Sequence, residues 1–466
     1  MGTITEADVR SILALLPPAS FTRLYCEHME KRTEAHLGYQ FLAALSLITQ
    51  TAPQQLSITQ GTDLYANELF LLLGASGLAR KSTVITMARR LLSDGDCGVD
   101  GAFPEAIVPS DIASDEGMQD LIQTKPRCML AMDEFGNFLQ KTVAPQHASR
   151  RTLVNQLFDA VPLGRIRVRN KQMQRTEASR NPRVTVLAGC APEYLMSYTR
   201  RVDWNGGFMS RWFIFYPTDS RKLTPPVPDA EEIKVLVKRL QFKARTRVTT
   251  RLQCAGRTPL AEGLWNSWIE RTRAVTDRLN SETARAVLQR TETHALKIAL
   301  LLSWDLGEAY LDQWRLSARA LVPALRFTNM HVRSIMRIID EIPANDEAAE
   351  RAAVLNAIAY EPKTTSRKQV LQAVKISAHK FKGHTTTLWQ SGDINVYGAD
   401  DGSAVSYSRI PRERARADAF DSLDLWDPPA EAVREERGAE DAIASIQAEA
   451  VQKAILDDVI ADDVEI

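Results

Sequence analysis

The spacing of apolar positions divides the chain into stretches of different character. Up to residue 60, apolar side chains recur every three or four residues, which is typical of helices with one buried face. From Asn67 onward, short apolar runs alternate with polar or helical stretches, as buried parallel strands of an α/β protein do. Helical periodicity returns between Asp229 and Glu341. The predicted strands are the runs ELFLLLGA, RCMLAMDE, RVTVLAGCA and RWFIFYP.

The pattern changes again after residue 344. Three helix-like stretches, EAAERAAVLNAIAY, SRKQVLQAVK and SAHKFKGHTTTLWQSGD, precede two alternating strands joined by a turn that contains glycine. This order predicts a winged helix-turn-helix with a basic third helix, in which Lys380 and Lys382 are candidate DNA contacts. Winged helices also serve as protein–protein modules, and the sequence leaves that alternative open.

Charge is distributed unevenly along the chain. The 466 residues include 58 Lys and Arg and 58 Asp and Glu, so the net charge is zero. From residue 411 to the end, however, there are 16 acidic and 6 basic side chains, a net charge of −10, which leaves +10 on the first 410 residues. A basic body with an acidic tail is expected of a nucleic-acid-binding protein that restrains itself or recruits a partner. A solvated surface with a disordered tail is the alternative.

These patterns together predict an α/β protein with five regions. They are an N-terminal helical region (1–66), an α/β core (67–228), a helical domain (229–343), a winged helix-turn-helix (344–410) and an acidic, partly disordered tail (411–466).

Composition argues against several classes of protein. The most apolar run, ALKIALLLSWDLG, is shorter than the roughly 20 residues that a membrane-spanning helix needs, and it contains Lys297. The N-terminus lacks the basic-then-apolar pattern of an export signal. Five scattered cysteines without a C-x-x-C pair indicate neither a disulfide framework nor a zinc site. We therefore expect a cytoplasmic protein without a membrane partner.

The segment GASGLARKST follows the first apolar run and departs from the usual phosphate-binding pattern, G-x-x-x-x-G-K-[ST]. Aligning Lys-Ser on Lys81 and Ser82 places Ala75 and Arg80 at the two glycine positions. A strand, flexible glycines, an ammonium group, a hydroxyl for Mg²⁺ and a helix N-terminus are nevertheless present. Arg80 must adopt a left-handed backbone or mark a different loop path, with its guanidinium free to meet phosphate. The candidate nucleotide-binding residues are Gly74, Ser76, Gly77, Arg80, Lys81, Ser82 and Thr83.

A second motif supports a nucleotide site. The run RCMLAM ends in Asp133 and Glu134, about 50 residues after the loop, where P-loop ATPases place acidic residues. One carboxylate holds Mg²⁺ and the other is the base that activates the attacking water. The order of these elements predicts an ATP site, with Ser82 and Asp133 as Mg²⁺ ligands and Lys81 and Glu134 as catalytic residues.

A basic segment, GRIRVRNKQMQR, lies between the acidic pair and the third core strand. Arg165, Arg167 and Arg169 alternate, so an extended strand puts them on one face, with Lys171 close behind. A hairpin inserted here could line a ring channel and follow a DNA backbone. Charges that blunt a solvated edge strand are the alternative.

Four segments, GASGLARKST, MDEFGNFL, VTVLAGCAPEYL and GGFMSRWFIFYP, resemble in that order the P-loop ATPases of phages, plasmids and integrated elements, which often lie beside or are fused to primases. The resemblance covers roughly residues 18 to 345. It implies a RecA-like or superfamily III-like core, ATP with Mg²⁺, a ring oligomer such as a hexamer, and work on DNA. It also implies that Arg211 is an arginine finger acting across a subunit boundary, for which a structural ion pair is the alternative. Cys190 stands where related ATPases often have a polar sensor, so the sensor stays unassigned.

The sequence thus predicts an oligomeric DNA-dependent ATPase, a replicative helicase or helicase loader of a mobile genetic element. The expected partners are DNA, in single-stranded form, other copies of the chain, and a primase or replication protein bound through the acidic tail. An ATP-switched DNA-binding regulator that does not translocate is the alternative. Glu134 and Arg211 favour hydrolysis, since a pure switch needs neither.

Overall fold

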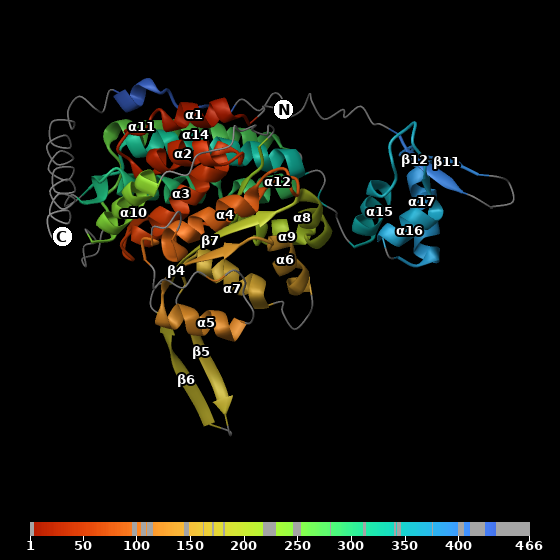
Figure 1. Cartoon of the computed structure of the whole chain (residues 1–466), viewed down its shortest axis with the longest axis horizontal. Coiled ribbons are helices and arrows are strands. Elements are labelled where there is room, and N and C mark those ends of the chain that lie inside the picture. The colour runs from red at the N-terminus through yellow and green to blue at the C-terminus, as the bar shows by residue number, and fades with distance from the viewer. Residues whose placement is uncertain are drawn as a thin grey trace.

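The computed structural model shows a mixed α/β protein with a parallel sheet at its centre (Figure 1). In the hairpin that spans 163–179, the backbone of the two strands is described but their side chains are not. The described residues are 4–95, 100–103, 109, 115–143, 149–161, 163–169, 172–179, 182–217, 230–245, 253–279, 281–310, 314–339, 342, 346–374, 376–398, 405–410 and 425–434.

The central sheet has four parallel strands in the order β4-β7-β3-β8. β7 lies between β3 and β4, and both β3 and β7 are buried along their whole length. Continuous apolar runs suit strands that are covered on both faces, so the prediction of buried parallel strands is confirmed. The bounds are β3 (Leu69–Leu73), β4 (Arg127–Met132), β7 (Arg183–Cys190) and β8 (Phe213–Phe215).

Helices cover both faces of this sheet. Successive residues of a strand point to opposite faces, so neighbouring residues of β3 pack against different sets of helices. Phe70 and Leu72 pack in one hydrophobic cluster, and Leu71 and Leu73 pack in another. The first cluster includes residues of α1 (Glu6–Leu13), α2 (Phe21–Arg32), α3 (Leu37–Thr51), α4 (Lys81–Arg89), α10 (Ala230–Arg245), α11 (Pro259–Arg278) and α13 (Thr291–Asp305). The second includes residues of α5 (Asp115–Thr124), α6 (Phe135–Val143), α7 (Ser149–Phe158), α8 (Pro192–Tyr198), α9 (Arg201–Asn205) and α12 (Glu282–Leu288), while α14 (Ala318–Ile338) contributes to both.

The two predicted helical regions therefore share their hydrophobic clusters with the α/β core. The N-terminal region is also not helical throughout. β1 (Ser57–Gln60) and β2 (Thr62–Tyr65) form an antiparallel hairpin, and β1 also pairs with β9 (Gln253–Cys254). The prediction of helix up to residue 60 is wrong here, because the turn at Gly61 has a φ of 72° and joins short segments rich in β-branched residues.

A second hairpin projects from the body between α7 and β7 (Figure 1). It consists of β5 (Leu163–Arg169) and β6 (Gln172–Ser179), paired antiparallel. The basic insertion is thus a hairpin, as predicted. Its three arginines occupy alternate positions on β5, where Arg165, Arg167 and Arg169 pair with Thr176, Gln174 and Gln172. Lys171 lies outside the described residues.

Residues 346–410 form a smaller unit with its own hydrophobic cluster, which includes Val354, Phe381 and Ile394. The order of three helices followed by two strands agrees with the prediction, and a short additional strand pairs with the second of these strands. The elements are α15 (Asp346–Asn356), β10 (Thr365–Ser366), α16 (Arg367–Val374), α17 (Ala378–Gln390), β11 (Ile394–Tyr397) and β12 (Ser406–Arg409), with the sheet order β10-β12-β11.

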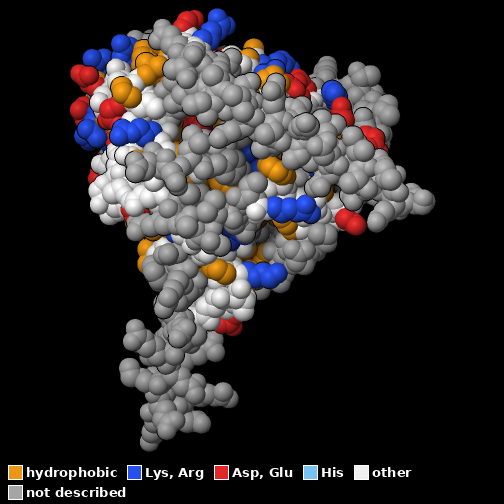
Figure 2. Space-filling view, turned by 90° about the vertical axis from the view of Figure 1, so that its left-hand side faces the viewer, with side chains coloured by type: hydrophobic (Ala, Val, Ile, Leu, Met, Phe, Trp, Pro, Cys, Tyr) orange, Lys and Arg blue, Asp and Glu red, His pale blue; other side chains and the backbone are white. Residues whose placement is uncertain are grey.

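Charged side chains of both signs share the described surface. On the side of the molecule that faces the viewer in Figure 2, Lys and Arg lie among Asp and Glu. Within the described ranges, no helix is both long enough and apolar enough to span a membrane.

Candidate functional site

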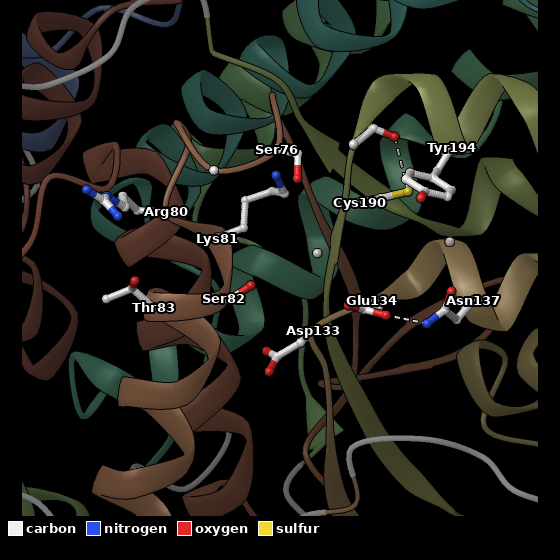
Figure 3. Close-up of a pocket in the computed structure, with 14 residues that line it drawn as sticks. Ser76, Arg80, Lys81, Ser82, Thr83, Asp133, Glu134, Asn137, Cys190 and Tyr194 are labelled. Carbon is white, nitrogen blue, oxygen red and sulfur yellow. Dashed lines mark hydrogen bonds between the residues drawn. The ribbon is translucent and has the colours of Figure 1, made fainter. Parts of the chain in front are cut away.

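The carboxyl ends of three neighbouring strands meet at a pocket of about 340 Å³ (Figure 3). β3 runs into the loop at 74–80, β4 is followed by Asp133, and β7 ends at Cys190. In parallel sheets, this edge is where ligands commonly bind. Six of the predicted nucleotide-binding residues line the pocket, namely Ser76, Gly77, Arg80, Lys81, Ser82 and Thr83, and Asp133 and Glu134 line it as well.

Arg80 adopts the left-handed conformation that glycine usually supplies at this position. Its φ and ψ are 53° and 28°, and it is the N-cap residue of α4. Its guanidinium points away from Lys81 (Figure 3) and pairs with Glu34 at 3.1 Å. The first of the two options that the sequence left open, a left-handed backbone, is therefore the one observed.

Gly74 supports the loop from behind and does not line the pocket. A Cβ atom at this position would lie 2.5 Å from the Tyr39 hydroxyl oxygen and 2.7 Å from Cβ of Ala79. The same hydroxyl donates a hydrogen bond to the carbonyl of Leu73 at 2.7 Å. The Gly74 N–H donates to the carbonyl of Cys190 at 3.2 Å, which joins the loop to the end of β7. Gly74 thus fixes the path of the loop from outside the pocket wall.

Lys81 lies at the start of α4, and its side chain enters the pocket (Figure 3). Its ammonium group donates to the carbonyls of Gly74 at 2.6 Å and Ala75 at 3.2 Å. Burial lowers the pKa of Lys81, and the nearby Cys190 and Glu193 partly oppose this effect. A bound anion would give the ammonium a charged partner in addition to neutral carbonyls. The first N–H groups of α4 lack helical partners and add to the attraction for an anion.

Ser82, at the start of α4, and Asp133, after β4, both line the pocket (Figure 3). Partial burial raises the pKa of Asp133, the charge of Glu134 raises it further, and Arg89 opposes both effects. A cation beside Asp133 would stabilise its charged form. Hydroxyl and carboxylate oxygens suit Mg²⁺, which commonly relies on one or two carboxylates together with substrate phosphates. Among the residues described, no group of three or more His, Cys, Asp and Glu could form a metal site made of protein ligands alone.

Glu134 has a partner that the sequence pattern did not identify. Asn137, one turn further along the chain in α6, donates its side-chain N–H to the Glu134 carboxylate (Figure 3). The amide therefore fixes the orientation of the carboxylate within the pocket. An i, i+3 spacing across a helix start could have suggested this contact, but Asn beside an acidic residue is too common in sequences to be diagnostic.

Two further residues complete the pocket wall next to Glu134. The ring of Tyr194, 53% exposed, lies against Gly136, where an added Cβ would come within 3.0 Å of the tyrosine side chain. Cys190 is buried, and burial raises the pKa of its thiol to about 12. Its thiol donates to the carbonyl of Ala191 at 3.3 Å. A neutral thiol thus occupies the position at which related ATPases often have a polar sensor.

Arg211 does not line the pocket. It precedes β8, at the amino end of the parallel sheet, whereas the pocket is at the carboxyl end. Its guanidinium donates to Asp159 at 2.8 and 3.2 Å and to the carbonyl of Gly207 at 2.8 Å. Within one chain, Arg211 therefore forms an ion pair, which was the alternative to an arginine finger.

The candidate DNA-binding lysines of α17 differ in their surroundings. Lys380 pairs with Glu350 of α15 at 2.7 Å, so part of its charge is neutralised within this unit. Lys382 is exposed on the same helix. The side chains of Arg165, Arg167 and Arg169 lie outside the described part of the structure.

No protein-family model matches this chain, and a search of curated proteins found no match either. The chemistry of the pocket therefore has to be inferred from its own residues.

Proposed function

We propose that the protein is an ATP hydrolase of the P-loop class. The observation that supports this most strongly is the convergence of Lys81, Ser82, Asp133 and Glu134 on one pocket at the carboxyl edge of the sheet. Two sequence motifs about 50 residues apart supply these four side chains, in the order that phosphoryl-transfer enzymes require. The left-handed Arg80 removes the main objection to the loop.

In this proposal each residue of the pocket has a defined role. Lys81 binds the β- and γ-phosphates with its ammonium group, and the N–H groups at the start of α4 bind the phosphate oxygens. Glu134 accepts a proton from the water that attacks the γ-phosphate. Asn137 orients the Glu134 carboxylate toward that water. Ser76, Gly77 and Thr83 would form another part of the wall, around the phosphates.

Mg²⁺ is the metal ion that fits this pocket. Ser82 and Asp133 would hold it, since they offer a hydroxyl from α4 and a carboxylate from the end of β4 to the same pocket. When bound, the ion neutralises negative charge on the phosphates. Partial burial raises the pKa of Asp133, and a bound cation would oppose that effect, as Arg89 does in part.

We further propose that the chain assembles into a ring, such as a hexamer, with a RecA-like or superfamily III-like core. Arg211 and the pocket lie at opposite edges of the sheet, so a head-to-tail contact between copies can bring Arg211 of one copy to the pocket of the next. In this arrangement, Arg211 exchanges Asp159 for the γ-phosphate of the neighbouring site.

We propose that the protein uses ATP hydrolysis to do mechanical work on DNA. The projecting β5–β6 hairpin carries three arginines at alternate positions, which suits contact with successive phosphates of a single strand. The unit at 346–410, interpreted as a winged helix, would add a contact through Lys382. These features support a replicative helicase or helicase loader of a mobile element, with a primase or replication protein as a further partner.

ATP binding and turnover by two variants test the proposed function. Lys81→Ala should lose ATP binding, because the ammonium contacts the phosphates in the ground state. Glu134→Gln should bind ATP and lose turnover, because the carboxylate acts only when water is activated. The wild-type rate should also rise with single-stranded DNA. Normal turnover by Glu134→Gln would contradict the base assignment, and ATP binding without any turnover in the wild type would favour the nucleotide-switched regulator.

A further inference from the structure

Residues 425–434 return to the body and pack against one side of α11 and one side of α14, although the unit at 346–410 precedes them in the chain. These two sides together are called the groove. One wall is a stripe of α11 that includes Leu260, Leu264, Trp268 and Arg271. The other is a stripe of α14 formed by Val322, Arg326, Asn329 and Arg333. Successive members of each stripe are three or four residues apart, so each stripe occupies one face of its helix.

Asn329 is the polar centre of this groove. Its side chain is only 1% exposed. Its oxygen accepts a hydrogen bond from the Trp268 indole at 2.9 Å. Its nitrogen donates to the carbonyl of Trp426 at 3.1 Å and to the carboxylate of Asp427 at 2.7 Å. Asn329 thus donates both of its amide hydrogens to the returning segment. A buried amide without hydrogen-bond partners would lower the stability of the fold.

Apolar contacts hold the segment on either side of Asn329. Trp426 packs against the main hydrophobic cluster, and the Arg271 guanidinium lies 5.1 Å from the centre of its ring. Ala432 and Val433 are buried against Leu264 and Val322. A single helical turn at 431–434 follows the Pro428-Pro429 pair.

Two further contacts come from half-buried arginines of α14, and of their partners Pro428 is buried and Asp427 is exposed. Arg326 donates to the carbonyl of Pro428 at 2.8 Å, and Arg333 lies 3.6 Å from the Asp427 carboxylate. Exposed ion pairs contribute little stability and weaken with salt. The segment therefore combines a small apolar anchor with polar contacts that can be broken, as expected of a reversible docking motif.

The position of the docked segment fixes the place on the body from which the chain continues after residue 434. In Figure 1 the docked turn, drawn in blue, lies beside α1 and α11, at the end of the body opposite the β5–β6 hairpin. From residue 435 to the end, the sequence has ten acidic and two basic side chains, a net charge of −8. Docking therefore anchors the start of this acidic stretch far from the arginines of the hairpin.

We propose that residues 425–434 are a releasable clasp, and that opening the clasp lets the acidic stretch compete with DNA for the basic hairpin. The competition rests on the proposed DNA-binding function, whereas the clasp itself does not. Release lengthens the tether, so that the acidic stretch can reach the end of the body that carries the hairpin. The clasp is thus a regulatory element for the proposed DNA site.

Hydrogen exchange on the full-length protein tests the clasp. Trp426→Ala removes the aromatic anchor, and Asn329→Leu removes the two donated hydrogen bonds from the groove side. In both variants, exchange of the amides at 426–434 should become about tenfold faster, because the docked state is less populated. Glu431→Gln is the matched control, since this exposed side chain lies in the same segment, and its exchange should equal that of the wild type. Unchanged exchange in both Trp426→Ala and Asn329→Leu would overturn the clasp.

Binding of single-stranded DNA at low salt tests the regulation. Trp426→Ala should bind DNA roughly three- to tenfold more weakly than the wild type, and high salt should remove the difference. Ending the Trp426→Ala chain after Arg434 should restore the affinity, because the competing charges are gone. Equal affinity of Trp426→Ala and a DNA-binding wild type would overturn the regulatory role. If the wild type does not bind DNA, the proposed function fails, and hydrogen exchange still decides whether the clasp exists.

Discussion

Arg80 holds a backbone conformation that costs an L-residue roughly 1–2 kcal/mol, because its Cβ crowds the following carbonyl. Its ion pair with Glu34 is half exposed and contributes at most about 1 kcal/mol. The ion pair therefore offsets at most part of the left-handed strain.

Two substitutions of Arg80 separate the backbone from the charge. Arg80→Ala and Arg80→Gly both remove the guanidinium, but only glycine relieves the left-handed strain. Arg80→Gly should be more stable than Arg80→Ala by about 1 kcal/mol, a figure that allows for the greater freedom of glycine in the unfolded chain. Urea denaturation of the two variants measures this difference. Equal midpoints would show that residue 80 does not adopt the left-handed conformation in solution.

The sequence predicted the charged residues of the pocket because their chemistry depends on local order along the chain. Lys81 and Ser82 begin a helix after a strand, and Asp133 and Glu134 follow another strand. Asn137, Tyr39 and Tyr194 were not predicted. Their roles depend on which surfaces meet in three dimensions: Tyr39, for example, reaches Leu73 from α3, 34 residues away. No local sequence pattern indicates such a contact.

At the scale of elements, β8 is attached to α14 through a histidine. The N–H of Ile214 donates to Nδ1 of His331 at 2.9 Å, and the ring stacks on Phe213 with centroids 4.6 Å apart. Burial lowers the pKa of His331 to about 3, and the neighbouring His294 adds to this effect. The buried contact between β8 and α14 thus contains a neutral imidazole.

This histidine should make the protein sensitive to acid. Below its ordinary pKa of about 6.5, the unfolded chain binds a proton at residue 331, whereas the folded chain does not bind one until about pH 3. The free energy of unfolding therefore falls as the pH falls through this window, by about 2 kcal/mol at pH 5. His331→Gln, which can still accept the Ile214 N–H, should lose that much less stability than the wild type between pH 7.5 and 5. Parallel pH profiles of urea unfolding for the two proteins would contradict a neutral buried His331.

Elements with strong apolar runs could be predicted, and elements defined by long-range packing could not. The four strands of the parallel sheet are mostly apolar: β3 and β8 are apolar throughout, and β4 and β7 are largely apolar after an initial arginine, a pattern that suits strands covered on both faces. By contrast, residues 425–434 are part of the segment 411–466 that the sequence predicts to be an acidic, partly disordered tail, because this segment has a net charge of −10. Their docking depends on a groove whose walls lie more than 90 residues earlier in the sequence, as the contact between Asn329 and Trp426 shows.

At the scale of the whole molecule, the described Lys, Arg, Asp and Glu side chains on the side shown in Figure 2 are mixed in sign. The hairpin instead concentrates positive charge, with three arginines within the seven residues of β5. A ring would bring several such hairpins together. Its assembly would also bring Arg211 of one copy toward the pocket of another, since the two lie at opposite edges of each sheet.

Mixing two inactive variants tests this arrangement. Arg211→Ala should bind ATP but lose turnover, because its site receives no guanidinium from the neighbouring copy, and Lys81→Ala should be inactive because it does not bind ATP. Mixed oligomers contain some interfaces with an intact Lys81 on one side and an intact Arg211 on the other. Partial activity should therefore return on mixing, measured as ATP turnover against the ratio of the two proteins.

Asp159→Asn provides the matched control, because it weakens the same ion pair while keeping the guanidinium. If Arg211 acts across a subunit boundary, this variant should keep its turnover, and the more weakly held guanidinium should reach the neighbouring site at least as readily. If Arg211 only stabilises the fold through Asp159, the two variants should lose activity and stability together, and mixing should rescue neither. Loss of turnover in Arg211→Ala alone, with rescue on mixing, is the combination that a structural ion pair cannot produce, since only a shared active site lets one inactive copy complete another.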